Sequence, residues 1–311
     1  MKKENDLPKI EILMSSFNGE GYIGEQIDTI LNQEKVNIHI SIRDDGSSDN
    51  TISIINQKIQ EYPGRISLFI GNNIGYRKSF LKLLDMSQEA DYYGFADQDD
   101  YWLKDKCIRG VEALRKIGSE IALYATGVTL TDKNLNIIGK TDSWNMPLTI
   151  ESYFTRQRLA GCTYIFTNAV LKLARQYSNL KLPNDQMPDH DFVVGSIAFA
   201  CGKVYLDKEN RIYHRRHSGS VTSGGMGAVK RIQVEYKLVF RRPHVQSTMA
   251  KLLLSKCKNN MDDKIVRFLE TVARCNDSLK TKITLIRYPG MTTGIKMCDF
   301  ETKIKIISGN Y

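Results

Sequence analysis

The segment VNIHISIRDDGSSDNTISII, residues 36–55, decides the fold. Its first half alternates apolar and polar residues, which is typical of a β-strand with two different faces. The predicted strand runs directly into Asp44 and Asp45, and a helix is predicted to begin at Asp49 or Asn50, because both are common N-cap residues. Strand, polar cluster and helix in immediate succession form the repeating unit of a parallel α/β sheet.

The same unit recurs on both sides of this segment. The sequence predicts further strands over 9–16, 65–71 and 91–96, and helices over 23–31, 52–59 and 80–84. Each strand is followed by polar residues, which are SSFNG, DDGSSD, NNIG and DQDD in chain order. Such alternation predicts a doubly wound, mostly parallel sheet, in which ligands bind at the carboxyl ends of the strands. We therefore expect the four clusters to converge and to form a nucleotide or phosphate site.

Beyond Trp102 the pattern changes from strict alternation to α+β. Helices are predicted over 107–116, from 150 and over 170–177, and strands over 121–131, 135–139 and 160–168. The glycine-rich segment 218–227 is the predicted linker. These features predict a catalytic α/β domain at 1–225, with an α+β acceptor half, and a basic, mainly helical extension at 226–311.

The basic charge of the chain is concentrated in this extension. The whole chain has a net charge of +9, and residues 228–311 hold 17 Lys and Arg against 7 Asp and Glu. The extension is predicted either to contact an anionic membrane surface or to be an ordinary solvated helical surface. A nucleic-acid-binding protein is disfavoured, because these basic residues lie outside the domain with the clustered loops and few aromatic residues accompany them.

The sequence also constrains the compartment. It has no apolar stretch long enough to span a membrane and no secretory signal, so we expect a cytoplasmic protein. The six cysteines lie far apart without a CxxC pair, which favours reduced thiols over a disulfide framework or a zinc site.

The stretch FADQDDYW, residues 95–102, predicts a metal site. In a strand-like backbone Asp97 and Asp99 would point to the same side, roughly 7 Å apart. Carboxylate oxygens favour Mg²⁺ or Mn²⁺ over zinc. The alternative is an acidic turn that caps the following helix.

Together, SSFNG, DDGSSDN, NNIG and FADQDDYW resemble the motifs of the family 2 nucleotide-sugar glycosyltransferases, which have the GT-A fold. The resemblance covers residues 8–225, and the aromatic pair after DQDD, with GCT at 161–163, is most similar to bacterial rhamnosyltransferases. It implies transfer of L-rhamnose from dTDP-rhamnose to a lipid-linked surface polysaccharide at the inner face of the plasma membrane. A UDP-hexose-dependent galactosyl- or glucosyltransferase is the alternative, and a homo-oligomer is left open. A sugar nucleotidyltransferase is disfavoured because SSFNGEGYIG contains no lysine.

The resemblance also implies roles for individual residues. The implied metal ligands are Asp97, Asp99 and His217, with a charged surface loop at 213–221 as the alternative. For the nucleotide-sugar donor it implies Ser15, Phe17, Asn18, Asp44, Asp45, Gly75, Asp97 and Arg215. For the acceptor it implies Trp102, Gly161, Cys162, Thr163 and His190, although 161–163 could be an ordinary buried strand.

An inverting displacement needs a base on the face opposite the departing diphosphate, so this carboxylate should come from a segment other than DQDD. MPDHDF, residues 187–192, is the candidate segment. The resemblance implies Asp191 as the general base, with Asp189 as a near neighbour. Either carboxylate could instead cap the helix that follows.

Overall fold

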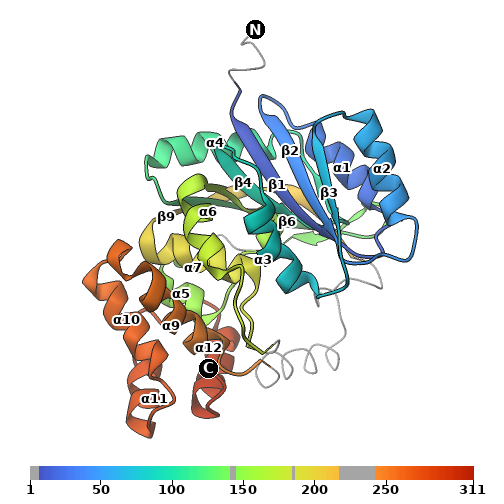
Figure 1. The fold of residues 1–311 in the computed structure, drawn as a ribbon. Coiled ribbons are helices and arrows are strands. Elements are labelled where there is room, and N and C mark those ends of the chain that lie inside the picture. Colours follow the sequence, from blue (N-terminus) through green and yellow to red (C-terminus); the bar gives the residue numbers. More distant parts are fainter. Residues whose placement is uncertain (1–6, 141–144, 184–185, 217–241) are drawn as a thin grey trace. The chain divides into compact units, whose positions relative to one another are not determined.

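The computed structural model describes residues 7–140, 145–183, 186–216 and 242–311. The chain forms two compact units that interleave along the sequence (Figure 1). Unit 1 consists of residues 1–144, 159–179 and 202–217, and unit 2 consists of 145–158, 180–201 and 218–311. The predicted domain boundary at 225/226 and the predicted linker lie outside the described residues, so both stay predictions.

Unit 1 contains, among its described residues, a sheet of nine strands in the order β3-β2-β1-β4-β8-β6-β9-β5, with β7 paired to β6. The first four strands are parallel, and the sheet becomes mixed beyond β4. The α/β fold predicted from the sequence is therefore confirmed. The strands are β1 (Lys9–Ser16), β2 (Asn37–Asp44), β3 (Ile66–Ile70), β4 (Tyr92–Ala96), β5 (Tyr101–Trp102), β6 (Ala122–Thr131), β7 (Ile137–Lys140), β8 (Ile165–Thr167) and β9 (Lys203–Arg215).

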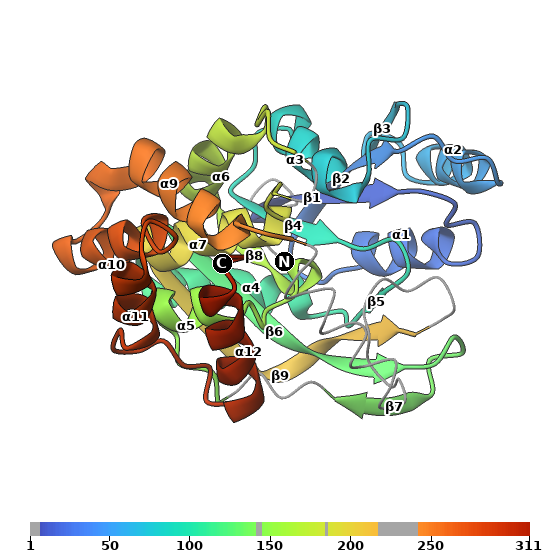
Figure 2. The same cartoon turned by 90° about the horizontal axis from the view of Figure 1, so that it is seen from below.

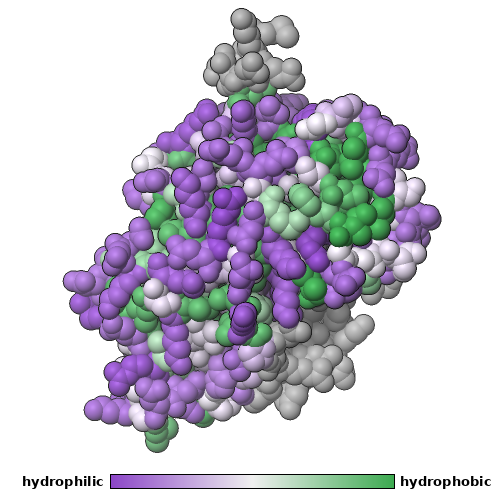
Figure 3. Space-filling view, viewed as in Figure 1, coloured by the Kyte–Doolittle hydropathy of each residue, from purple (hydrophilic) through white to green (hydrophobic). Residues whose placement is uncertain are grey.

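Helices cover both faces of this sheet (Figure 2). Alternate residues of β1, such as Ile12 and Met14, share one core with α1 (Ile23–Leu31), α2 (Thr51–Glu61) and α4 (Lys106–Ile117). On the other face Phe95 of β4 packs edge-on against Phe80 of α3 (Tyr76–Met86), with ring centroids 5.6 Å apart, and α6 (Asn168–Ala174) lies beside it. Burial of both faces explains why the predicted strands are so apolar. At the sheet edge, apolar side chains gather over β3 (Figure 3), where Ile70 is 61% exposed.

The long strand β9 was not predicted from the sequence, because its polar residues KVYLDKENRIYHR lack a clean alternation. It runs parallel to β6 and antiparallel to the short strand β5. The register pairs Tyr101 with Tyr213 and Trp102 with Ile212. This pairing brings residues near 214 to the acidic cluster that precedes β5.

Unit 2 is mainly helical, as the sequence predicted for the extension. Its helices are α5 (Ile150–Thr155), α7 (His190–Cys201), α9 (Val245–Cys257), α10 (Asp263–Ala273), α11 (Leu279–Ile286) and α12 (Lys296–Ile307). Tyr153 of α5 stacks on Phe192 and Phe199 of α7, and its hydroxyl donates to the carbonyl of Asp191 at 3.0 Å. A Cβ on Gly195 would lie 2.1 Å from that hydroxyl oxygen, so a glycine is needed where the tyrosine crosses α7. None of the described helices is both long and apolar enough to cross a lipid bilayer.

Candidate active site

The carboxyl ends of β1, β2 and β4 meet at one edge of the sheet in unit 1. The register pairs Ser16 with Asp44 across β1 and β2, and Met14 with Ala96 across β1 and β4. The polar loops that follow these strands therefore start side by side, although they lie far apart in the sequence. The predicted convergence of the loops is confirmed.

Asp44 organises the loop after β2. Its side chain is fully buried, and its two carboxylate oxygens accept four hydrogen bonds. The donors are the Ser16 hydroxyl (2.8 Å), the Ser47 hydroxyl (2.6 Å), and the backbone N–H groups of Gly46 (3.1 Å) and Ser47 (2.7 Å). Because a buried carboxylate is costly unless such donors surround it, Asp44 fixes the shape of residues 44–47. Its predicted contact with the nucleotide base stays a prediction.

Asp45 joins the loop after β2 to the turn after β3. Its carboxylate accepts the backbone N–H groups of Ile74 (3.0 Å) and Gly75 (2.8 Å) and forms an ion pair with Arg43. Gly75 has φ +80°, a conformation that glycine adopts without strain. Asp45 and Gly75, both predicted at the donor, thus belong to one hydrogen-bonded network.

The loop after β1 is fastened to the same network. Asn18 has φ +47°, its N–H donates to the Ser47 hydroxyl (2.9 Å), and its side-chain oxygen accepts the N–H of Ser48 (2.9 Å). Ser15 donates to the Ser79 hydroxyl at 2.7 Å. Phe17, by contrast, is 44% exposed, so its ring offers a face on which a planar base could stack.

Gln98 connects the acidic turn to the loop after β1 through hydrogen bonds, a role that was not predicted from the sequence. Its side-chain nitrogen donates to the Phe17 carbonyl at 3.0 Å, and its side-chain oxygen accepts the Phe17 N–H at 2.9 Å. The amide thus pairs with one backbone residue as a neighbouring strand would. A Cβ on Gly19 would lie 2.4 Å from the Gln98 oxygen, so only glycine leaves room for this pairing.

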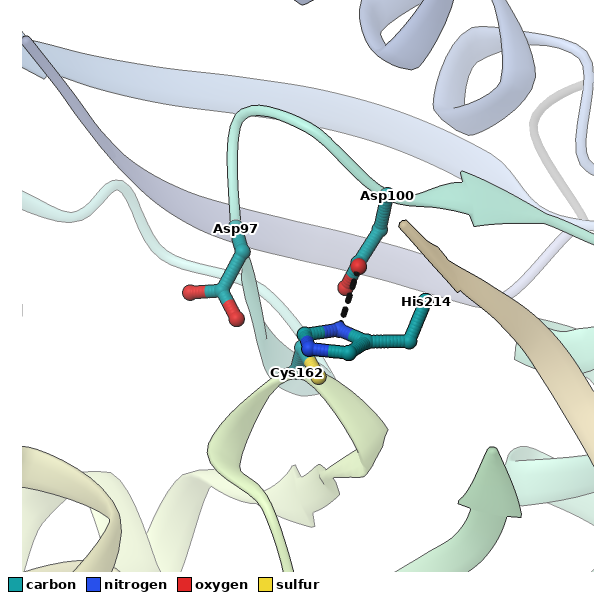
Figure 4. A group of neighbouring side chains, drawn as sticks. All are labelled: Asp97, Asp100, Cys162 and His214. Carbon is teal, nitrogen blue, oxygen red and sulfur yellow. Dashed lines mark hydrogen bonds and ion pairs between the residues drawn. The ribbon is translucent and has the colours of Figure 1, made fainter. Parts of the chain in front are cut away.

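The acidic segment is a turn and not an extended strand. β4 ends at Ala96, and Gln98 and Asp99 form the turn, so the spacing argument for Asp97 and Asp99 does not apply. Instead, Asp97, Asp100, Cys162 and His214 gather, each with one potential ligand atom within 4.8 Å of the others (Figure 4). Asp99 is not part of this cluster, which was identified among the described residues only.

His214 and Asp100 are the least expected members of the cluster. The antiparallel register of β5 with β9, continued by one residue, brings Asp100 opposite His214, and their Oδ1 and Nδ1 atoms are 2.7 Å apart. Burial disfavours the charged ring, but the Asp100 carboxylate outweighs it and raises the pKa of His214 to about 8. The other Asp100 oxygen is buried and has no hydrogen-bond partner among the residues described.

This cluster fits a divalent cation. A buried carboxylate oxygen without a donor is costly, and a cation would satisfy it. Two carboxylates and an imidazole suit Mn²⁺, since Mg²⁺ prefers oxygen ligands throughout. Burial raises the pKa of the Cys162 thiol well above its usual value, so this sulfur lines the site as a neutral thiol. The predicted ligand His217 lies outside the described residues.

Two other predicted residues are buried in unit 1. Trp102 is 1% exposed and belongs to the core, with the Lys106 Nζ lying 3.4 Å from its ring centroid. Arg215 is 4% exposed, forms an ion pair with Glu25 and lies over the ring of Tyr22. The burial of Trp102 indicates that it serves core packing. Arg215 is held at the start of α1 by its contacts with Glu25 and Tyr22.

The segment Gly161–Thr163 forms a buried 3₁₀ helix and not the predicted strand. Only residues 165–167 of the predicted strand 160–168 pair with the sheet, as β8. The Thr163 hydroxyl donates to the Ala160 carbonyl at 2.6 Å, so it stabilises the turn. Among residues 161–163, Cys162 lies in the cluster with Asp97, Asp100 and His214.

In unit 2, His190 and Asp191 begin α7. The Asp191 carboxylate is half-buried and accepts the N–H of Phe192 at 2.8 Å. The Asp189 carboxylate is held by Arg242 at 2.6 Å. That ion pair holds Asp189 in place, and the assignment of the general base to Asp191 stays a prediction.

The comparisons with known proteins agree with this geometry. The sequence model described as Glycosyl transferase family 2 matches residues 11–174, which include the loops after β1, β2, β3 and β4. The chain belongs to this family of glycosyltransferases. It is 30% identical over 215 residues to the dTDP-rhamnosyl transferase RfbG of Shigella flexneri, and the alignment covers 67% of this chain and 72% of that protein.

A second curated relative and two solved structures extend the comparison. The chain is 22% identical over 235 residues to the GalNAc(5)-diNAcBac-PP-undecaprenol beta-1,3-glucosyltransferase of Campylobacter jejuni, covering 74% of this chain and 72% of that one. Its fold is similar to S. aureus TarS 1-349 in complex with UDP (TM-score 0.57, 15% identity, 91% and 76% coverage). It is also similar to the mannosyltransferase PcManGT of Pyrobaculum calidifontis with GDP-Man and Mn²⁺ (TM-score 0.53, 11% identity, 99% and 88% coverage). These two structures show that the glycosyltransferase has the GT-A fold.

The contact between Gln98 and Gly19 generates a testable prediction. Replacing Gly19 by Ala should displace the Gln98 amide and cost its two hydrogen bonds, or about 1 to 2 kcal/mol of stability at this partly exposed site. Nucleotide binding, measured by calorimetry, should weaken with it. Gly21→Ala is the matched control, because a Cβ there meets nothing within 4 Å. Equal stability and equal nucleotide affinity of the two variants would show that the hydrogen bonds of Gln98 are unimportant.

Proposed function

We propose that this glycosyltransferase transfers L-rhamnose from dTDP-rhamnose to a lipid-linked saccharide, with inversion at the anomeric carbon and help from a divalent cation. The observation that carries the proposal is the cluster of Asp97, Asp100 and His214, which lies at the same sheet edge as the three fastened loops. Ordered loops at the carboxyl ends of parallel strands, a stacking face and a cation site together suit a nucleoside diphosphate.

The nature of the sugar rests on similarity. RfbG of Shigella flexneri, whose name describes a dTDP-rhamnosyl transferase, supports the rhamnosyl donor. The Campylobacter jejuni glucosyltransferase and the TarS complex with UDP-GlcNAc favour the alternative, a UDP-hexose-dependent transferase of the same fold. The name of the Campylobacter jejuni protein also includes a diphosphate-linked polyprenol, which supports a lipid-linked acceptor.

The mechanism assigns separate tasks to the residues of the site. Residues 15–18, 44–47 and 74–75 bind and orient the nucleotide through the loops that Asp44 and Asp45 fasten. Asp97, Asp100 and His214 would hold the cation, and Asp100 fixes the orientation of the imidazole ring. Bound there, the cation supplies positive charge that offsets the charge developing on the departing diphosphate.

Asp191 is the proposed general base. As the acceptor hydroxyl oxygen attacks the anomeric carbon, the Asp191 carboxylate accepts its proton, and the diphosphate leaves with the bonding electron pair. The stacking of Tyr153 on Phe192 and its hydrogen bond to the Asp191 carbonyl hold the start of α7 in place. The carboxylate is thereby positioned on a packed helix and not on a loop.

The cation site can be tested by binding. Asp97→Asn and His214→Gln should each weaken Mn²⁺ binding at least tenfold, measured by titration calorimetry or by the paramagnetic effect of Mn²⁺ on water relaxation. Asp99→Asn, which alters the residue predicted from the sequence, should have a smaller effect, because Asp99 lies outside the cluster. A larger effect at Asp99 than at His214 would move the site back to the Asp97–Asp99 pair.

The general base can be tested by separating binding from transfer. Asp191→Asn should bind the dTDP-sugar donor as tightly as the wild type and lose a factor of about 10² to 10⁴ in transfer rate, because the amide cannot accept the proton. Asp189→Asn is the comparison variant. Because Asp189 forms an ion pair with Arg242, we expect its loss to change the transfer rate less than the loss of Asp191 does. Full activity of Asp191→Asn would assign the base to another carboxylate.

The exposed side chains of unit 2 bear on the predicted membrane contact. Among the basic residues of the extension, Arg242 is paired with Asp189, Lys258 is paired with Glu270, and Arg241 lies outside the described residues. A more suitable surface is formed by α11 and α12, which contact each other. We call it the α11–α12 surface and define it by the exposed apolar side chains of Leu279 (72%), Ile283 (42%), Met297 (62%), Phe300 (59%) and Ile307 (63%).

The α11–α12 surface has the character of an interfacial membrane contact. Met297, Phe300 and Ile307 recur at helical spacing on the exposed side of α12, while Thr302 and Ile306 on its other side are buried. Exposed basic residues, Lys280 on α11 and Lys296 on α12, flank this apolar stripe. Apolar side chains that enter the headgroup region, with lysines attracted to anionic lipid, are the features of peripheral binding. We propose that this surface holds the enzyme on the membrane that carries its acceptor.

Vesicle flotation tests this surface. Met297→Glu combined with Phe300→Glu should lower binding to vesicles rich in phosphatidylglycerol by about tenfold or more, because each carboxylate replaces an inserted apolar group and repels the lipid. Ile137→Glu combined with Ile138→Glu is the matched control, because these residues are equally exposed (60% and 57%) but belong to unit 1. Equal losses in the two double variants would show that the effect is not specific to α11 and α12.

A further inference from the structure

Unit 2 contains a cavity that the proposed donor site does not use. Its volume is about 170 Å³, several times the room that one water needs. Three segments form its wall: the end of α5 with Arg156, the start of α7 with Asp189 and Phe192, and the C-terminal residues Arg242 and Lys305. We call it the Lys305 pocket.

The charges in the Lys305 pocket are unbalanced. Arg156 pairs with Glu301 at 2.8 Å, and Arg242 pairs with Asp189 at 2.6 Å. The ammonium of Lys305 has only an amide partner, the Gln246 side-chain oxygen at 2.9 Å, and no carboxylate among the described residues lies within ion-pair distance of it. Among the described residues that line the pocket, three cations and two carboxylates leave one positive charge in excess.

This excess charge is held away from water. Burial and the neighbouring charges of Arg242 and Arg156 lower the pKa of Lys305 to about 8. The Nε of Arg242 is buried and has no hydrogen-bond partner within the described part of the chain. A pocket that carries both a poorly compensated ammonium and an unused guanidinium donor is suited to an oxyanion, which would satisfy both groups.

The place of the pocket in unit 2 suggests what would carry this anion. Phe192 lines the pocket, and Asp191, the proposed base, is its neighbour in α7. The hydroxyl that attacks the sugar must lie within reach of this base, so the acceptor passes close to the pocket. The residues proposed to bind the nucleotide-sugar donor belong to unit 1. We therefore assign the pocket in unit 2 to the saccharide acceptor.

We propose that the Lys305 pocket binds a phosphate or diphosphate group of the acceptor and thereby anchors the acceptor in unit 2. The proposal rests on the proposed function. Phosphate is favoured over a carboxylate because its oxygens can accept from Lys305 and both arginines from different directions, whereas a carboxylate is planar and carries a single charge.

A substitution of Lys305 separates binding from folding. In metal-free buffer, where the cation-dependent donor site is not loaded, inorganic phosphate should raise the Tm of the wild type relative to chloride of equal ionic strength. Lys305→Met should have a Tm at least equal to the wild type without phosphate, because it removes a partly buried charge that no carboxylate compensates. The same variant should lose the phosphate-dependent rise. Lys303→Gln, an exposed lysine of the same helix, is the matched control and should keep it.

Two outcomes of this experiment would overturn the proposal: no phosphate-dependent stabilisation of the wild type, and an equal stabilisation of the wild type and Lys305→Met. If phosphate does not stabilise the wild type and Lys305→Met is less stable than the wild type, Lys305 contributes to packing. Arg242→Gln is a second variant of the same pocket, and phosphate should raise its Tm less than it raises that of the wild type.

Transfer assays then identify the source of the phosphate. With a saccharide acceptor that carries a terminal phosphate, Lys305→Met should raise KM about tenfold and leave kcat nearly unchanged, and with the dephosphorylated saccharide it should change neither. A loss of phosphatidylglycerol vesicle binding in Lys305→Met, without this difference in KM, would assign the pocket to a lipid headgroup and overturn the proposal. Because phosphate binding is measured without a donor, it would persist if the proposed transfer reaction were wrong.

Discussion

Parallel pairing of β1 with both β2 and β4 is the constraint on which the proposed donor site depends. It ends three strands at the same edge, and each strand delivers a polar loop there. Without further contacts these loops would be free to move apart. The buried carboxylate of Asp44 and the amide of Gln98 prevent this by hydrogen bonding within and between the loops. The site is therefore held by polar contacts whose geometry only the correct strand register allows.

The parallel half of the fold could be predicted from the sequence because its signals are local. Each strand is an apolar run that ends in a polar loop, and α1 at Ile23–Leu31 was predicted within the same bounds. The mixed half lacks such signals. β9 is half-exposed and polar, and its pairing with the two-residue strand β5 depends on contacts between residues more than 100 positions apart.

The residues of the candidate cation site could likewise be predicted only where the sequence signal is local. Asp97 was found from the sequence because it follows a strand directly. Asp100 and His214 could not be found, since their contact arises from the register of β5 with β9. The spacing that singled out Asp99 assumed an extended backbone, whereas the chain turns at residues 98–99. A motif thus located the site, and only the tertiary pairing of strands supplied its members.

The two units carry complementary unsatisfied charges, and this division follows the chemistry of the proposed reaction. Unit 1 contains the Asp97 and Asp100 carboxylates at the candidate cation site, where one Asp100 oxygen has no hydrogen-bond partner among the described residues. Unit 2 contains guanidinium and ammonium groups around a cavity, which is the proposed anion site. In a transfer between two phosphate-bearing substrates, the donor diphosphate leaves as negative charge accumulates, so it needs a mobile cation. The acceptor phosphate does not react, so fixed side chains suffice to hold it. Two different kinds of phosphate site also help the protein to discriminate between the leaving group and the anchor.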